Sequence, residues 1–264
     1  MKAVAFRFAA VGALALAALA LLPVAPGDAE RSGRAGVVVS LDGSISPNRL
    51  PRHRPVPVSL TLSGSVHLAD RLTPPRLTRI EVAFGSRGDL STRGLPSCPR
   101  PRLRNATRRQ ALARCRGALV GRGVIVTEVR LATGEPLLTR ARVVAFNGER
   151  AGRPAVWVHA YSSSPPASFV LPFYLRRLRS GSFGVLIRAP LARALGKWPR
   201  LRSFEITLGR RYRVDGAERS YLSALCPLPP RFHIGYFPMA RATYSFSPAP
   251  ILTTTILRGC RTRD

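Results

Sequence analysis

The feature of this chain that most constrains its fold is a segment that occurs twice. Residues 75–87 and 199–211 are identical at six positions, and three further positions exchange one large apolar residue for another. Each copy is followed by a Cys-Pro-x-Pro motif and later by a Cys-Arg pair, at Cys98, Cys115, Cys226 and Cys260. Chance similarity in an arginine-rich chain is the alternative, but landmarks repeated in the same order favour an internal duplication.

The segments between these landmarks have the pattern of β-strands. Apolar and polar residues alternate over residues 56–62, 80–84 and 204–208, which gives each segment one apolar and one polar face. Asn147-Gly148 is a signal for a chain reversal between two further strands. Frequent Pro and Gly residues between the strands are typical of sandwiches with many corners.

Two short helices are expected among the strands. Asn105 is expected to cap a helix over residues 106–114, and Pro190 to open one over residues 191–195. The predicted fold class is therefore mainly β, with two related sandwich-like β modules and two short helices. The predicted divisions are a signal peptide, a first β module and a second β module, over residues 1–29, 30–134 and 135–264.

The first thirty residues predict export. Lys2 and Arg7 precede an apolar run that Pro23 ends, and small residues lead up to Ala29. This is the arrangement of a Sec-type signal peptide, with cleavage expected after Ala29. The apolar run is shorter than the roughly 17–25 residues of a membrane-spanning helix, and a retained N-terminal anchor is the alternative. The expected location is secreted or in the extracytoplasmic cell envelope.

Four cysteines in an exported chain predict two disulfide bonds. Their spacing is neither that of a zinc site nor that of a CxxC motif. Three connectivities are open. We expect the local one, Cys98 with Cys115 and Cys226 with Cys260, because it gives each copy of the repeat one bridge.

The chain is strongly basic. It contains 42 Lys and Arg residues against 13 Asp and Glu residues, and its formal net charge is +29. Removing the leader lowers this charge by one unit, because Lys2, Arg7 and Asp28 are lost. A charge of this size attracts polyanions such as teichoic acids, anionic lipid or nucleic acid. Since only Lys2 and Lys197 are lysines, a GC-rich coding sequence that places arginine at solvated positions is the alternative cause.

Arginines crowd the first predicted disulfide loop and form the candidate polyanion-binding site. This site comprises Arg100, Arg102, Arg104, Arg108 and Arg109. A second group comprises Arg176, Arg177 and Arg179. Guanidinium groups bind phosphate through paired hydrogen bonds. The first loop has no interleaved aromatic residues on which bases could stack, so the expected partner is an anionic cell-wall polymer or anionic lipid, with no specific nucleic acid.

Glu81 and Glu205 occupy the same place in the two copies and are the candidate catalytic residues. Two carboxylates roughly 5–10 Å apart could act as acid and base in a secreted glycan hydrolase, which is the alternative function. Each glutamate alternates with apolar residues and has arginines nearby, so a cross-strand ion pair is favoured instead. The expected function is that of a non-enzymatic protein associated with the cell envelope.

Other motifs that name a reaction are absent from the sequence. HExxH and GxSxG do not occur, and no Gly-rich phosphate loop is present. The histidines are scattered without metal-ligand spacing, at His53, His67, His159 and His233. We expect no metal and no cofactor.

The chain resembles exported β-rich proteins of high-GC Gram-positive bacteria, a group with no assigned activity. The resemblance rests on the signal peptide, the Cys-Pro motifs and the Ala-Leu-Val-Gly-x-Gly stretch at residues 118–123. It extends over most of the mature chain, including residues 145–148 and 209–212. The resemblance implies export and a β-rich fold and adds no chemistry.

Overall fold

The protein is mainly β, as the alternating sequence pattern predicts. The computed structural model describes residues 29–68, 75–130, 135–164, 166–194 and 199–263. Apart from Ala29, the predicted signal peptide lies outside the described residues.

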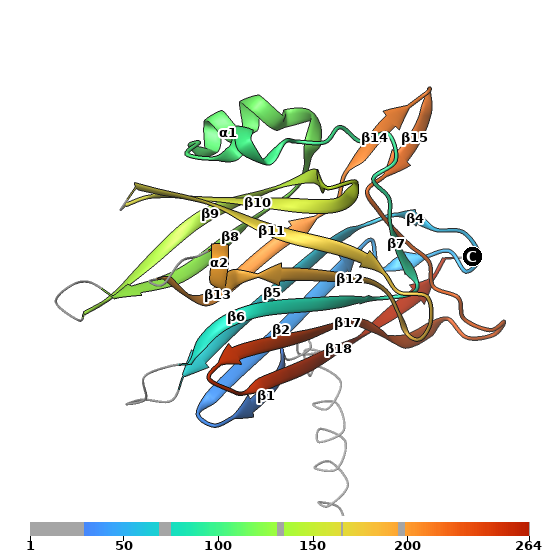
Figure 1. The fold of residues 1–264 in the computed structure, drawn as a ribbon. Helices are drawn as coiled ribbons and strands as arrows, with labels where there is room; N and C mark the ends of the chain where they lie inside the picture. Colours follow the sequence, from blue (N-terminus) through green and yellow to red (C-terminus); the bar gives the residue numbers. More distant parts are fainter. Residues whose placement is uncertain (1–28, 69–74, 131–134, 165, 195–198, 264) are drawn as a thin grey trace, which may run out of the picture.

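Thirteen strands of the described chain form one large curled sheet (Figure 1). The first part of the chain supplies β1 (Glu30–Arg34), β2 (Val37–Ser46), β5 (Ser59–Leu68), β6 (Arg76–Gly85), β8 (Leu119–Arg130) and β9 (Pro136–Arg150). The second part supplies β10 (Arg153–Ser163), β11 (Pro166–Arg177), β12 (Phe183–Pro190), β13 (Pro199–Leu208), β17 (Ile234–Ser247) and β18 (Ile251–Thr262). The short strand β3 (Arg49–Leu50) pairs in parallel with β18 at one edge.

The order of the strands shows how the two copies are combined. One half of the sheet runs β1-β2-β5-β13-β8-β9, and the other runs β10-β11-β12-β6-β17-β18. The two halves have the same strand order once each strand from the first part of the chain is matched with one from the second part. The matched pairs are β1 and β10, β2 and β11, β5 and β12, β6 and β13, β8 and β17, and β9 and β18. The strands that carry the repeated segment are exchanged, because β6 lies between β12 and β17 while β13 lies between β5 and β8.

An irregularity at the same place in both exchanged strands supports the duplication. The pairing of β6 with β17 skips Thr78, and the pairing of β13 with β8 skips Arg202. Thr78 and Arg202 occupy the same position in the repeated segment. Since a β-bulge is a local feature that most strand pairs lack, its presence at matched positions indicates a common origin. The two halves therefore share register as well as strand order.

The two copies do not form two separate modules as the sequence analysis expects. Strands from residues 30–134 and 135–264 are interleaved in one sheet. The predicted boundary after residue 134 lies in the connection between β8 and β9, which pair along their length. The physical reason is the exchange, because each half takes one internal strand from the other part of the chain. In the strand order, the change from one half to the other comes at the β9–β10 turn, where Ala151 and Gly152 have φ angles of 48° and 71°.

The sheet curls around one apolar core to which both halves contribute. This core includes Val39 and Leu41 of β2 together with Tyr244 of β17 and Ile256 of β18, all of them fully buried. β18 lies against β1 and β2, so the two ends of the sheet meet. The Tyr244 hydroxyl crosses the core and donates a hydrogen bond to the Ser40 carbonyl oxygen at 3.2 Å.

Two ion pairs join strands that are distant in the sequence. Arg258 of β18 pairs with Asp42 of β2 and donates to the Gly43 carbonyl oxygen at 2.9 Å. Glu128 of β8 is 3% exposed and pairs with Arg202, the bulge residue of β13. Removing either partner of a buried pair leaves an uncompensated charge, so the second pair holds the exchanged strand β13 in register with β8.

Shorter elements lie at the ends of the curled sheet. One small sheet contains β4 (Val56–Pro57), β16 (Leu222–Ala224) and β7 (Gly88–Leu90), and a hairpin contains β14 (Arg211–Val214) and β15 (Ala217–Ser220). The helical elements are η2 (Arg100–Leu103), α1 (Arg108–Cys115), η3 (Arg116–Ala118) and α2 (Leu191–Ala194). Among the described residues, no helix combines the length and apolar character needed to cross a membrane.

The α1 helix begins two residues later than the sequence analysis expects. Its N-cap is Thr107, not Asn105, whose φ angle of 52° belongs to a turn. The Thr107 side chain accepts a hydrogen bond from the Gln110 N–H, and the Gln110 side chain accepts one from the Thr107 N–H. This capping box satisfies two backbone donors at once, so Thr107 is the better start.

Because β6 and β13 are exchanged, we predict that neither part of the chain, residues 30–134 or residues 135–264, folds alone. Residues 30–134 expressed separately should remain unfolded, because β6 would lack β12 and β17, and β5 and β8 would lack β13. Mixing this fragment with residues 135–264 should restore the β-sheet signal in circular dichroism and a single sedimenting species. A folded, monomeric 30–134 fragment would show that the copies are independent modules.

Candidate functional site

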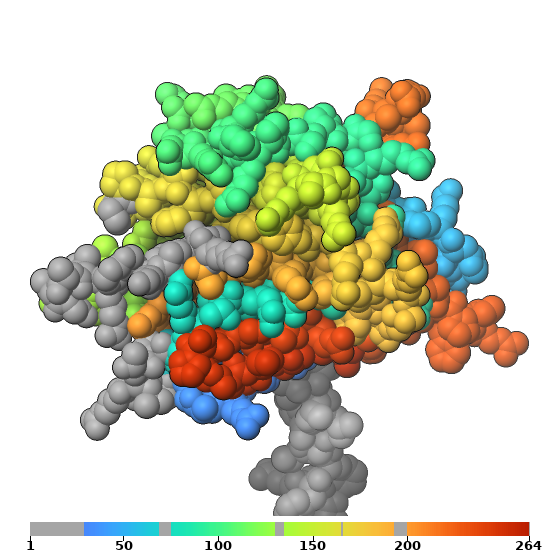
Figure 2. All heavy atoms as spheres, in the orientation of Figure 1, coloured from blue at the N-terminus to red at the C-terminus, as the bar shows by residue number. Residues whose placement is uncertain are grey.

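The first disulfide loop forms a layer over one side of the sheet. We call residues 93–118 the flap. It contains η2, α1 and η3, and α1 packs on β9 and β10 (Figures 1 and 2). The flap has a small core of its own, in which Leu103 and Ala111 are fully buried against Phe146 and Trp157.

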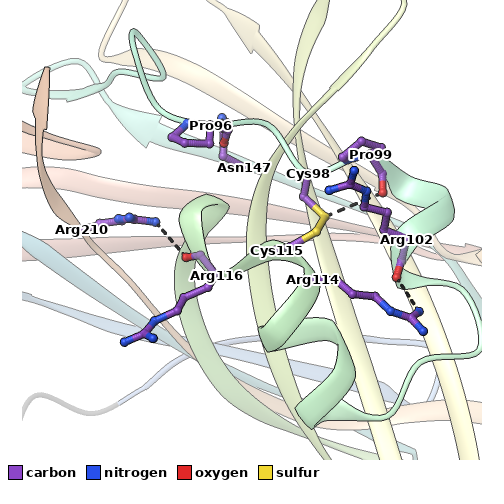
Figure 3. The surroundings of a disulfide bond; sticks show 9 residues. All are labelled: Pro96, Cys98, Pro99, Arg102, Arg114, Cys115, Arg116, Asn147 and Arg210. Atoms are coloured by element: carbon purple, nitrogen blue, oxygen red, sulfur yellow. Dashed lines mark hydrogen bonds between the residues drawn. A yellow bond between two sulfur atoms is a disulfide. The ribbon is translucent and has the colours of Figure 1, made fainter.

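A disulfide bond ties the two ends of the helical part of the flap (Figure 3). Cys98 is joined to Cys115, with their Cα atoms 5.6 Å apart, and the Cys98 N–H donates to the Asn147 carbonyl oxygen at 2.9 Å. Cys226 is joined to Cys260, with a Cα–Cα distance of 5.9 Å. The cysteine pairs that lie at disulfide distance are therefore the local pairs expected from the repeat. The second bridge differs from the first in that it joins a loop to strand β18.

Removing the first bridge should loosen the flap and leave the sheet intact. The double variant Cys98→Ser with Cys115→Ser should lose about 2–5 kcal/mol of stability, as secreted domains do when a native bridge is removed. Amide hydrogen exchange should accelerate over residues 99–114 and stay slow in β9 and β10, because the helical part of the flap packs in its own small core and not in the main core of the sheet. Uniform acceleration across the chain would contradict this separation.

His159 of β10 fastens the flap to the sheet. Its ring is fully buried, and its Nε2–H donates to the carbonyl oxygen of Ala106 in the flap at 2.8 Å. The Nε2 atom also lies 3.2 Å from the Ser168 hydroxyl oxygen. Burial lowers the pKa of His159 below its ordinary value of 6.5, and the bond to Ala106 opposes part of this shift. The ring is therefore neutral at neutral pH, where it holds the flap through one N–H.

The lowered pKa of His159 predicts a loss of stability in acid. Above the ordinary pKa of 6.5 neither the folded nor the unfolded ring is protonated; as the pH falls below it, the unfolded ring gains a proton that the buried ring does not. The melting temperature should therefore fall with pH more steeply in the native protein than in the His159→Gln variant, whose amide N–H can still donate without titrating. Parallel melting curves for the two proteins from neutral pH down to about pH 5 would contradict this role.

The flap presents the arginines that the sequence analysis assigned to polyanion binding. Arg102, Arg104 and Arg109 are exposed, and Arg100 and Arg108 are half-buried. The chain has no Asp or Glu between residues 89 and 128, and none of these five arginines forms an ion pair within the described residues. The flap that carries them stands out at one end of the molecule (Figure 2), and none of the five lines the hollows described below.

Not all five of these arginines have a guanidinium group that is available to a ligand. The Arg100 guanidinium lies 5.9 Å from the centroid of the Trp157 ring and donates to the Val170 carbonyl oxygen at 3.5 Å. The Arg102 carbonyl oxygen accepts a hydrogen bond from Arg114 at 3.1 Å (Figure 3). Arg100 therefore docks the flap on the sheet, whereas the Arg102 guanidinium remains available.

A second set of arginines lines an open groove that borders the flap. Two adjoining hollows of about 660 and 560 Å³ share Pro154, Leu175 and Arg176 as a common wall. We call them together the arginine groove. Seven exposed arginines line it, namely Arg93, Arg150, Arg153, Arg176, Arg177, Arg188 and Arg219. Of the second group expected from the sequence, Arg176 and Arg177 belong to this groove, and Arg179 is exposed outside it.

Carboxylates neutralise only part of the arginine groove. Arg177 pairs with Asp89 at 2.9 Å, and Arg188 pairs with Glu81 at 2.5 Å. The remaining arginines form no ion pair among the described residues, and these are Arg93, Arg150, Arg153, Arg176 and Arg219. The groove is therefore a concave surface with an excess of positive charge.

Two groove arginines are held close to each other. Arg150 and Arg153 are directly opposite in the β9–β10 register, a placement in which like charges repel. Arg150 lies 5.0 Å from the Tyr174 ring centroid and donates to the Tyr174 hydroxyl, which fixes its position. The register thus places two arginines opposite each other, and neither forms an ion pair among the described residues, so an anion bound near them would reduce any repulsion between them.

The candidate catalytic glutamates do not share a site. Glu81 lies on β6 between β12 and β17, and Glu205 lies on β13 between β5 and β8. Each alternates with residues that pack in the core, so both side chains are on the solvent side of the sheet. Glu81 pairs with Arg188, its neighbour on β12, as the ion-pair interpretation predicts. Glu205 is exposed and lines neither the arginine groove nor the apolar cavity described below.

The structure gathers no metal-binding cluster among the described residues. Sequence reasoning did not find the groove as a whole, because its arginines come from the flap, the β9–β10 turn, β11, β12 and β15. The feature of the sequence that could have pointed to the groove is the pair Arg150 and Arg153, which lie on either side of a turn. Comparison of the chain with protein-family models, with curated proteins and with solved structures found no match.

Proposed function

We propose that this is an exported, non-enzymatic protein of the cell envelope that binds an anionic polymer in the arginine groove. The observation that supports the proposal is the set of five exposed groove arginines without carboxylate partners, gathered from the flap, the β9–β10 turn, β11 and β15 into one concavity. Guanidinium groups suit phosphate because their planar forks form paired, charge-assisted hydrogen bonds.

The shape of the site favours a chain over a membrane surface. The two hollows continue into each other along Pro154, Leu175 and Arg176, so a flexible polymer can contact both. A bilayer is flat at this scale and does not follow a concave surface as a flexible chain can. Tyr174 is the aromatic residue at the groove, and Arg150 covers its ring, so the groove lacks a free platform for base stacking. We therefore name a phosphate-bearing wall polymer as the ligand class, with the flap arginines as additional contacts.

Matched sets of arginine variants test this function. The first set changes Arg150, Arg153, Arg176 and Arg219 to Gln, and the control set changes Arg31, Arg34, Arg122 and Arg140, which are exposed elsewhere. A third set changes Arg102, Arg104, Arg108 and Arg109 of the flap. Binding of inorganic polyphosphate and of purified teichoic acid should weaken most in the groove set, less in the flap set and least in the control set. Each of the three sets removes the same charge, because each changes four arginines.

Salt dependence gives a second measurement on the same proteins. The slope of log K against log salt concentration should become shallower by roughly 0.7 for each phosphate contact that the groove set loses, as for single-stranded polyanions. Equal losses in all three sets would mean that the positive charge acts only through its total, which contradicts a specific groove. Tighter binding to phosphatidylglycerol vesicles than to either polymer would assign the surface to lipid instead.

A further inference from the structure

The second feature that can bind a ligand is an apolar cavity inside the curled sheet. Its volume is about 290 Å³, close to the lower end of the roughly 300–1,000 Å³ of small-molecule pockets. Residues of both halves line it, including Leu60 of β5, Ile187 of β12, Leu208 of β13 and Met239 of β17. The cavity adjoins the arginine groove, since Leu90 and Val185 line both.

The core is incompletely filled at this place. Leu60, Ile187, Leu208 and Met239 keep 6–8% of their surface accessible, whereas core residues such as Leu41 keep none. Protein interiors are close-packed, and an unfilled apolar volume costs stability because its lining residues lose their contacts. An apolar ligand that filled this volume would recover those contacts.

The mouth of the cavity carries a cation in an apolar setting. Arg87 is exposed, and its guanidinium lies 3.9 Å from the centroid of the Phe237 ring, which also lines the cavity. Arg87 forms no ion pair within the described residues, and its guanidinium donates one hydrogen bond there, to the Pro227 carbonyl oxygen at 3.5 Å. Arg258, the other arginine at the cavity, is already paired with Asp42. Arg87 is therefore the group that can receive an anionic head.

We propose that the cavity binds the acyl chain of a single-chain anionic amphiphile, with its carboxylate or phosphate head held by Arg87. The cavity is small and apolar, which suits an acyl chain, and its lining offers one exposed cation without an ion pair among the described residues. The proposal does not depend on polymer binding in the arginine groove, because Arg87 is not one of the groove arginines and the cavity shares only Leu90 and Val185 with the groove.

A chain-length series tests the proposal in the mature, full-length protein. Saturated fatty acids from hexanoate to hexadecanoate are titrated by calorimetry, and one length should bind most tightly with a saturable, one-site isotherm. Ile187→Phe fills part of the cavity and should shift the preferred length to shorter chains, whereas Leu60→Ala enlarges it and should shift the preference to longer chains. The control Val39→Ala removes core volume away from the cavity and should lower the melting temperature without changing the preferred length.

The head-group contact is tested separately. Arg87→Gln should weaken fatty-acid binding roughly tenfold, because a charge-assisted hydrogen bond is worth about one power of ten in affinity, and Arg122→Gln should leave it unchanged. The groove set of arginine variants should also leave it unchanged. Loss of both ligands in that set would point to a general structural defect.

The source of the chain is distinguished by vesicles that contain a fluorescent lysophospholipid. Transfer of that lipid to the protein would assign a phospholipid source, and binding of free fatty acid alone would assign a soluble amphiphile; both support the cavity as an acyl site. The proposal is overturned if no chain length gives saturable binding, or if Ile187→Phe and Leu60→Ala leave the length preference where it is in folded proteins.

Discussion

The exchange of β6 and β13 is the constraint on which the rest of the structure depends. Each half of the sheet is completed by a strand from the other part of the chain, so the backbone hydrogen bonds of one half require the presence of the other. The same exchange places Phe84 of β6 and Leu208 of β13 on the wall of one cavity. It also brings Glu81 of β6 beside Arg188, which then lines the arginine groove. Both candidate sites therefore exist only when the strands are exchanged.

The arginine groove occurs where the two copies differ. Between β6 and β8 the first copy has the flap, and between β13 and β17 the second copy has the β14–β15 hairpin and β16. Arg93 of the flap and Arg219 of the hairpin meet at the groove, so these two divergent insertions meet at one surface. The strands keep the duplicated pattern because their pairing demands it, whereas loops tolerate change and acquire binding residues.

Local signals in the sequence predicted the local features of this structure. Alternation around Ile80 and Phe204 identified strands, and the duplicated cysteine motifs identified the bridge partners. The ion-pair interpretation of Glu81 followed from its place on the polar face of its strand. Alternation shows which face of a strand is buried but not which strand lies beside it, so the exchange and the single sheet could not be read from the pattern. The groove and the cavity depend on that long-range pairing and were missed for the same reason.

The positions of the arginines help more than the total net charge in deciding whether the positive charge reflects composition or function. A coding bias toward arginine adds charge at solvated positions everywhere, including Arg122 and Arg140 on open strands. It does not account for Arg150 and Arg153 facing each other across a tight turn, where their repulsion lowers stability. The contact with Tyr174 fixes the position of Arg150 beside this turn. Arginines without carboxylate partners in one concavity are therefore the feature that supports the proposed binding of an anion, whereas the total charge alone does not.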